Sequence, residues 1–340
     1  MAALSQTAED RPARLTDARP AQTIRNLFAR QTTWIVVIFI ALIVTFGVIA
    51  GPAFASLSNA RNILASVAIL LVLSLGQMLV VLTAGIDLSG GGILVFSGVV
   101  ATMTMNAMGG LNGILTGLVV GIAAGAGWGL VNGLLVTRAK IPPIIATLGT
   151  LGMTMGLALV ITDGIDLRAP LELVQTLGVG DIAGAVPWIA VIALLLALVA
   201  AVVLNETVFG RRTYAVGASS AAAERAGIRV SRHLVVIYTI AGALAGIAGF
   251  LALARFGTTT LAGHSEDSLK AITAVVLGGT SLFGGSGKVV GTVIGAFIPV
   301  ILLNGFVITG VQAFWQQFAI GLVLVVAVFI DRIRHSPDRM

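Results

Sequence analysis

The feature that most constrains this chain is the recurrence of long apolar segments separated by short polar ones. A helix needs about 20 apolar residues to cross the hydrocarbon core of a bilayer. Charged residues make up only 10% of the chain, whereas soluble domains carry about 25%. We therefore predict an all-α polytopic membrane protein with about ten transmembrane helices. The expected spans are 34–54, 63–83, 91–108, 113–136, 142–161, 187–204, 234–254, 270–283, 288–308 and 314–330.

The arginines and lysines are distributed unevenly among the segments that join these spans. With the N-terminus inside, 16 of the 20 lie on the cytoplasmic side, as the positive-inside rule requires. Both termini are therefore expected in the cytoplasm, as a disordered tail at 1–33 and a short tail at 333–340, around a transmembrane domain at 34–332. The same rule explains the basic pI near 10.7, so we expect membrane lipid and no nucleic acid as a partner.

Three of the spans are expected to be irregular. The eighth is short and ends in Gly278 and Gly279, which is typical of a broken or re-entrant helix. The third and fifth spans start with helix-poor sequence, at 90–92 and 142–143. Span four has a glycine at every fourth position from Gly113 onward, and such a stripe allows helix backbones to pack closely.

One long polar segment, 205–233, interrupts the apolar pattern on the predicted cytoplasmic side. Its centre, 218–226, is expected to form a short helix that Ser219 or Ser220 caps and Gly227 ends in a left-handed turn. A helix of exposed alanines with a few charges builds no hydrophobic core of its own. We therefore expect another protein to bind it.

A small set of polar residues lies within or beside the apolar spans. Asp87 is the acid of this set, and an ionisable group at membrane depth is costly and usually functional. Asp87 either caps span three through free backbone N–H groups or lies on a translocation pathway. Ser89, Gln77, Asn132 and Thr147 are candidates for the same pathway, where they would bond a solute hydroxyl. Each would equally serve as a hydrogen-bonding partner of a neighbouring helix.

The sequence offers no recognisable site for catalysis. Residues 284–288 resemble a phosphate-binding loop, but Leu282 and Val289 stand where that loop requires glycine and serine or threonine. The chain therefore has no ATP site of its own. It has no cysteine and only three histidines, which lie far apart in sequence, so we expect no metal site, no cofactor and no enzymatic activity.

Four motifs carry a family resemblance: AGIDLSGGG (84–92), NGLLVTRAKIPPIIATLGT (132–150), GRRTYAVGASSAAAERAGIRV (210–230) and AVVLGGTSLFGGSGK (274–288). In this order they resemble the bacterial sugar permeases of ATP-binding-cassette (ABC) transporters, in the ribose/xylose/arabinose/galactoside group. The resemblance covers about residues 34–332. The chain departs from the group where Gly90 follows GIDLS, because valine or a similar residue is usual there, and glycine loosens this loop.

The resemblance implies the permease subunit of an ABC importer in the bacterial inner membrane, which moves a monosaccharide or related polyol by alternating access. It implies three partners: a separate ATP-binding subunit, a periplasmic sugar-binding protein and a second permease chain, identical or paralogous. The matching residues that would bind the ATP-binding subunit are Gly217, Ala222, Ala223, Gly227 and Ile228. We add Glu224, Arg211 and Arg212 to this coupling site as charged neighbours, although the arginines also mark the cytoplasmic side.

The alternative function is an autonomous, ion-coupled secondary transporter of a small polar solute. Such a carrier needs an intramembrane carboxylate or histidine relay. The sequence offers Asp87 alone for that role, which favours the importer.

Overall fold

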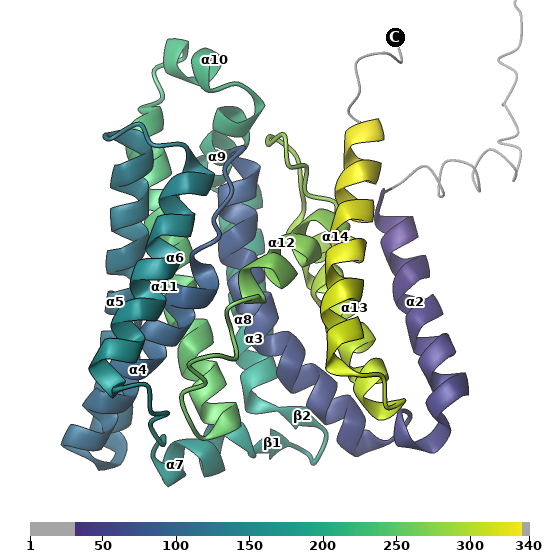
Figure 1. The fold of residues 1–340 in the computed structure, drawn as a ribbon. Coiled ribbons are helices and arrows are strands. Elements are labelled where there is room, and N and C mark those ends of the chain that lie inside the picture. The colour runs from purple at the N-terminus through teal and green to yellow at the C-terminus, as the bar shows by residue number, and fades with distance from the viewer. Residues whose placement is uncertain (1–30, 335–340) are drawn as a thin grey trace, which may run out of the picture.

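The computed structural model describes residues 31–334 of the 340-residue chain as a bundle of long helices with one short hairpin (Figure 1). The expected all-α polytopic fold is thereby confirmed, while the tails at 1–30 and 335–340 lie outside the described residues. The elements are α2 Gln31–Ala50, η1 Gly51–Ala53, α3 Leu57–Leu82, α4 Gly90–Met108, α5 Gly110–Thr137, α6 Pro143–Thr162, α7 Leu171–Leu173, η2 Val174–Gly178, β1 Asp181–Ile182, β2 Val186–Pro187, α8 Trp188–Glu206, α9 Val208–Ala218, α10 Ser220–Arg225, α11 Val230–Phe256, α12 Asp267–Leu277, α13 Val289–Ile308 and α14 Ala313–Arg334.

Successive long helices run in opposite directions through the bundle. α2 begins and α14 ends at the side that carries α9 and α10, and α7, β1 and β2 lie at the other side (Figure 1). The arginine-rich segment 205–233 therefore shares one face with both ends of the bundle. This is the arrangement that the charge distribution predicts, so we call this face cytoplasmic and the opposite face outer.

Eight helices within residues 31–334 are long and apolar enough to cross a membrane, and they correspond to expected spans one to seven and nine. The tenth span corresponds to α14, whose apolar part is Phe314–Phe329. The eighth differs from the expected 270–283, because α12 has only 11 residues. It ends where Gly279 adopts a φ of 88° and donates its N–H to the Val276 carbonyl. Eleven residues rise about 16 Å, so α12 is a half-helix, as the short glycine-ended segment suggested.

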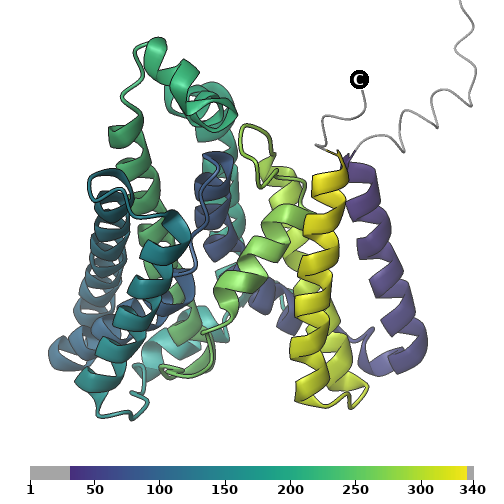
Figure 2. The same cartoon turned by 45° about the horizontal axis from the view of Figure 1, so that its top comes forward.

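α4 and α12 begin beside each other inside the bundle. Gly91 N in the first turn of α4 donates a 2.8 Å hydrogen bond to Ser268 Oγ in the first turn of α12. Non-helical segments, 83–89 and 257–266, precede the two helices. Figure 2 shows α12 between the group formed by α4, α5, α6 and α11 and the pair of α13 and α14. Irregular backbone at membrane depth is tolerated only where protein buries it or it lines a cavity, so these two breaks are the first places to look for a site.

Small residues set the closeness of the packing around these breaks. α5 lies along α11, and a Cβ added at Gly125 or Gly129 would overlap a backbone carbonyl of α11, that of Gly242 or Tyr238. At the outer end of α5, a Cβ on Gly113 would lie 2.7 Å from the carbonyl oxygen of Met105 in α4. The glycine stripe of span four is therefore a helix-packing stripe, as expected from its four-residue spacing.

The stripe supports a matched pair of substitutions on α5. We expect Gly129→Ala to lower the stability of the purified protein by about 1–3 kcal/mol, the usual cost of overpacking, because the backbone around Tyr238 must move. Gly127→Ala is the control, since nothing lies within 4 Å of its added Cβ. Heating in detergent followed by size-exclusion chromatography measures the difference. Equal loss of folded protein in both variants would contradict the close packing of α5 on α11.

Candidate coupling and translocation site

The cytoplasmic segment forms the short helix that its sequence predicts. The Ser219 hydroxyl caps α10 by accepting a 3.2 Å hydrogen bond from Ala222 N. Gly227 follows the helix with a φ of 83°, a left-handed conformation in which glycine is unstrained. α10 projects from the cytoplasmic side of the bundle beyond α9 (Figure 1). The local capping rules therefore succeed here without information from the rest of the fold.

The candidate coupling residues divide into an exposed set and an inward-facing set. Ala223 is 4% exposed and packs with Val216 and Val230, while Ile228 is half-buried against the same small cluster. Gly217 is also buried. The exposed candidates are Arg211, Arg212, Ala222, Glu224 and Gly227. A partner protein would therefore contact the exposed set, whereas the inward-facing set fixes the helix to the permease.

α9 joins this helix to two cytoplasmic ends of the bundle. A Cβ at Gly217 would overlap the Leu82 carbonyl oxygen and lie 2.6 Å from Gly285 N. Gly285 N itself donates to the same Leu82 oxygen at 2.9 Å. The end of α3, the buried face of α9 and the loop 278–288 thus meet at one point. That loop connects α12 to α13, so α9 contacts the segment that follows the half-helix.

Two side chains of α9 strengthen this junction. Tyr214 donates its phenolic O–H to the Gly287 carbonyl at 3.0 Å, and burial raises the pKa of Tyr214, so the phenol remains a donor at neutral pH. Thr213 Oγ1 lies 2.9 Å from Nε2 of His233 in the first turn of α11. The Phe209 ring packs on the same imidazole, with the ring centres 4.8 Å apart. α9 is therefore bonded both to the α12–α13 loop and to α11.

The candidate pathway residues gather around the break between α3 and α4. One Asp87 carboxylate oxygen accepts from Ser89 N at 2.8 Å and from Ser89 Oγ at 2.5 Å. Asn132 Nδ2 donates to Ser89 Oγ at 2.8 Å, and the hydroxyl of Thr150 donates to Asn132 Oδ1 at 2.7 Å. A single chain of hydrogen bonds therefore connects the break to α5 and α6.

Gln77 on α3 and Thr147 on α6 also bond the same break. With its amide oriented to suit its neighbours, Gln77 donates to the Asp87 carbonyl at 2.8 Å and accepts from Asp87 N at 3.2 Å. Thr147 Oγ1 accepts from Leu88 N at 3.1 Å. The backbone of Asp87 and Leu88 thus finds side-chain partners on α3 and α6, as buried backbone groups require.

All five of the candidate pathway residues are buried in the single chain. The most exposed is Gln77 at 5%, and Ser89, Asn132 and Thr147 are fully buried. They contact packed protein and one another in this conformation. The five side chains are therefore a connected polar core at the helix break, and any access of solute to them requires the surrounding helices to move.

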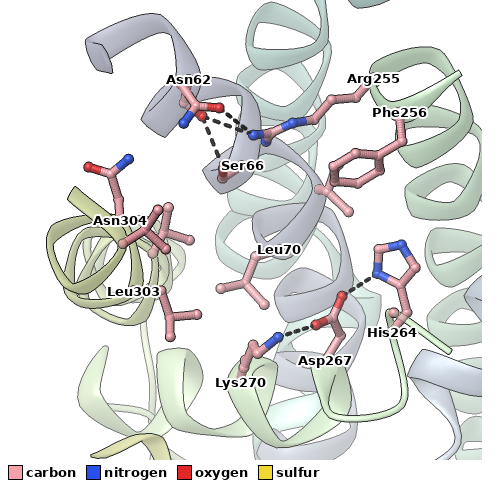
Figure 3. A pocket seen from close by; sticks show the side chains of 14 residues that line it. Asn62, Ser66, Leu70, Arg255, Phe256, His264, Asp267, Lys270, Leu303 and Asn304 are labelled. Carbon is pink, nitrogen blue, oxygen red and sulfur yellow. Dashed lines mark hydrogen bonds and ion pairs between the residues drawn. The ribbon is translucent and has the colours of Figure 1, made fainter. Parts of the chain in front are cut away.

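Sequence reasoning missed a second polar cluster, which lies at the start of α12. The expected map placed His264 and Asp267 in an outer loop. In the structure, Asp267 accepts from His264 Nδ1 at 2.6 Å and from Lys270 Nζ at 2.8 Å, next to a cavity (Figure 3). The expected eighth span began at 270, whereas α12 begins at Asp267, so hydropathy left His264 and Asp267 outside the span. The signal available in the sequence was the i, i+3 spacing of these three residues.

A polytopic helical bundle with buried helix breaks is the architecture of a membrane transport protein. The family described as "Branched-chain amino acid transport system / permease component" matches residues 59–328. The chain belongs to this family. It is the permease subunit of an ABC importer, a multi-pass protein of the inner membrane, and a transport component rather than an enzyme.

Several curated proteins are similar over most of their length. The ribose import permease protein RbsC of Bacillus subtilis is 40% identical over 85% of this chain and 89% of its own. The fructose import permease protein FrcC of Rhizobium meliloti is 35% identical over 87% and 84%. The autoinducer 2 import system permease protein LsrC of Enterobacter sp. is 36% identical over 88% of each chain. No solved structure matches this chain.

Proposed function

We propose that this permease imports a monosaccharide or a related polyol by alternating access, driven by ATP hydrolysis in a separate subunit. The observation that carries the proposal is the junction of α9 with Leu82 and Gly285, which links an exposed helix on the cytoplasmic face to the half-helix α12. Permeases named for ribose and fructose import are 40% and 35% identical to this chain. Both solutes are small and rich in hydroxyl groups, which can bond the polar side chains at the helix break.

The coupling step follows from the two faces of α10. The ATP-binding subunit grips the exposed set, with Ala222 allowing close approach and Arg211, Arg212 and Glu224 available for ion pairs. A partner can shift an equilibrium only by contacting two states differently. Closure of the ATP-binding subunits therefore pulls α10, and buried Ala223 and Gly217 pass the displacement to α9 and to the α12–α13 loop.

Asp87, Ser89, Gln77, Asn132 and Thr147 take the role of a gate core in this scheme. They hold segment 83–89 in place and so fix the first turn of α4. That turn contacts the first turn of α12 through Gly91 and Ser268. Movement of α12 therefore shifts the first turn of α4 and strains the hydrogen bonds of the gate core. Solute passes when the polar groups exchange these bonds for bonds to the solute. A second permease chain, paired with this one in the membrane, and a periplasmic sugar-binding protein at the outer loops complete the importer.

The second candidate remains an ion-coupled secondary transporter, and one observation favours it. His264, Asp267 and Lys270 form a hydrogen-bonded set beside α4, in addition to the buried Asp87. Intramembrane acid and histidine groups of this kind also serve as proton relays. Transport by the chain alone under an ion gradient distinguishes this candidate from the importer.

The proposed coupling is tested by capturing the tagged chain from detergent-solubilised membranes of its own bacterium. We expect an ATPase with a P-loop to co-purify with the wild-type chain and to be lost when residues 211–229 are scrambled. Ala222→Trp is the finer variant, since Ala222 is exposed, and Gly127→Ala on the exposed side of α5 is its control. ATPase retained at the wild-type level by the scrambled chain would contradict the coupling site.

A further inference from the structure

A cavity of about 310 Å³ lies between α3, the ends of α11 and α13, and the start of α12 (Figure 3). Its volume is at the lower end of the range for small-molecule sites, about 300–1,000 Å³. Five of its lining residues are aliphatic, among them Leu70 on α3 and Leu303 on α13. Charged and amide groups stand at its two ends: Asn62 and Arg255 at one end, and Asp267 and Lys270 at the other.

The cavity extends from the outer face deep into the bundle. α3 starts at its outer end with Leu57, so Asn62 lies near the outer face and Leu70 further inside. At the other end, Asp267 adjoins Ser268, which bonds the first turn of α4. α4 runs from that turn to its last residue, Met108, at the outer face. Asp267 and Lys270 therefore lie at membrane depth, where charged groups are rare unless they pair and face a cavity.

The deep end offers both donors and acceptors of hydrogen bonds. Asp267 uses one oxygen for His264 Nδ1 and the other for Lys270 Nζ, which leaves a lone pair on each oxygen. Lys270 spends one of its three N–H donors on this bond. The side chains of Asp267 and Lys270 are 14% and 19% exposed, so both reach the cavity. Their charges cancel, so the deep end suits a neutral group better than an ion, while Arg255 adds one positive charge at the other end of the cavity.

The outer end of the cavity also offers hydrogen-bond donors, together with an aromatic ring. Arg255 donates to Asn62 Oδ1 at 2.7 Å and lies over the Phe256 ring, 5.2 Å from its centre. Asn62 keeps its amide N–H groups, and Arg255 keeps further guanidinium donors. Phe256 lines the cavity as a flat apolar surface. A sugar presents the complementary pattern, with hydroxyl groups around its edge and C–H groups on its faces.

We propose that this cavity is a binding site for a neutral monosaccharide, which rests there in the outer half of the permease before the gate core opens. The site deepens the proposed import function and depends on it. Asp267 and Lys270 hold hydroxyl groups at the deep end, and the aliphatic wall and Phe256 exclude water around the sugar ring. His264 is a positioning residue: it fixes one oxygen of Asp267, and its own Nε2 is buried without a hydrogen-bond partner among the described residues.

The natural absence of cysteine allows a clean test with single cysteines. Ser66→Cys places a thiol on the cavity wall, and Ser58→Cys places one at an exposed position of α3 outside it. Each variant is assembled with the ATP-binding subunit and the sugar-binding protein in right-side-out vesicles. Uptake of labelled neutral monosaccharides, D-ribose and D-fructose first, identifies the imported sugar, and a membrane-impermeant methanethiosulfonate then modifies the thiol from outside.

We expect the imported sugar to slow modification of Ser66→Cys, by roughly tenfold when its concentration is about ten times its dissociation constant. Ser58→Cys should react equally with and without sugar. Protection should disappear when Asp267→Asn or Lys270→Met is added to Ser66→Cys, and D-gluconate, an anion of similar size, should protect poorly.

Three results would overturn the site. They are a Ser66→Cys thiol that the reagent does not reach, equal modification with and without a sugar that the same vesicles import, and protection by D-gluconate but not by that sugar. In each of these cases sugar uptake persists and the proposed function stands. Absence of uptake of every neutral monosaccharide by the wild-type complex would instead contradict the proposed function itself.

Discussion

Gly217→Ala is expected to reduce sugar uptake by the assembled importer to the level of a preparation without ATP, while the chain still inserts in the membrane. The added methyl group would overlap the Leu82 carbonyl oxygen and lie 2.6 Å from Gly285 N. Both obstacles are backbone atoms at the junction of α3 with the α12–α13 loop, so no side chain can rotate to make room. Overpacking of this kind costs about 1–3 kcal/mol, and here it separates the elements that transmit the motion of α10.

The reading that distinguishes uncoupling from misfolding is ATP hydrolysis in the same proteoliposomes. We expect the Gly217→Ala complex to assemble and hydrolyse ATP without importing sugar. Gly127→Ala provides the matched control, because it makes the same change in a helix where nothing lies within 4 Å. Wild-type uptake by Gly217→Ala would show that the α9 junction does not carry the coupling.

Asp87→Ala is expected to lower uptake by more than a factor of ten and to destabilise the chain. The substitution leaves Ser89 N–H and the Ser89 hydroxyl without their acceptor in a fully buried position. A buried donor that loses its partner costs about 1–3 kcal/mol. Because Ser89 also accepts from Asn132, the disturbance extends to α5 and shifts the first turn of α4.

Asp87→Asn removes the negative charge of the carboxylate but keeps a hydrogen-bond acceptor in the same position. The amide oxygen of asparagine can still accept from Ser89, so we expect this variant to insert normally and to keep most of its thermal stability. Its uptake measures how far the acid itself matters to the pathway. Asp163→Asn, at the exposed outer end of α6, is the control. Full uptake by Asp87→Ala would show that Asp87 acts only as a replaceable helix cap and that the gate core does not depend on it.

Features governed by local rules could be predicted from the sequence. The cap at Ser219 and the left-handed Gly227 define α10 within a few residues, and both are present in the structure. The spans follow from apolar length, and the orientation follows from the arginines. The glycine stripe of α5 likewise depends only on spacing.

Features that depend on tertiary contacts could not be predicted in this way. Ala222 and Ala223 look equivalent in the sequence, yet the first is exposed and the second is buried against Val216. The polar residues of the gate core were recognised singly, but the hydrogen bonds that join α3 and the break after it to α5 and α6 depend on the tertiary fold. His264 and Asp267 fell outside the expected spans, because the contact of Asp267 in α12 with His264 in the preceding loop depends on how that loop folds back into the bundle.

The most direct measurement is sugar uptake into proteoliposomes that contain this chain with and without its ATP-binding subunit. With the sugar-binding protein outside, we expect uptake only when the ATP-binding subunit and ATP are present on the cytoplasmic face. A proton or sodium gradient should produce no uptake by the chain alone. Accumulation of sugar by the chain alone under such a gradient would contradict the importer and favour a carrier that uses Asp87 or the His264–Asp267 pair as its relay.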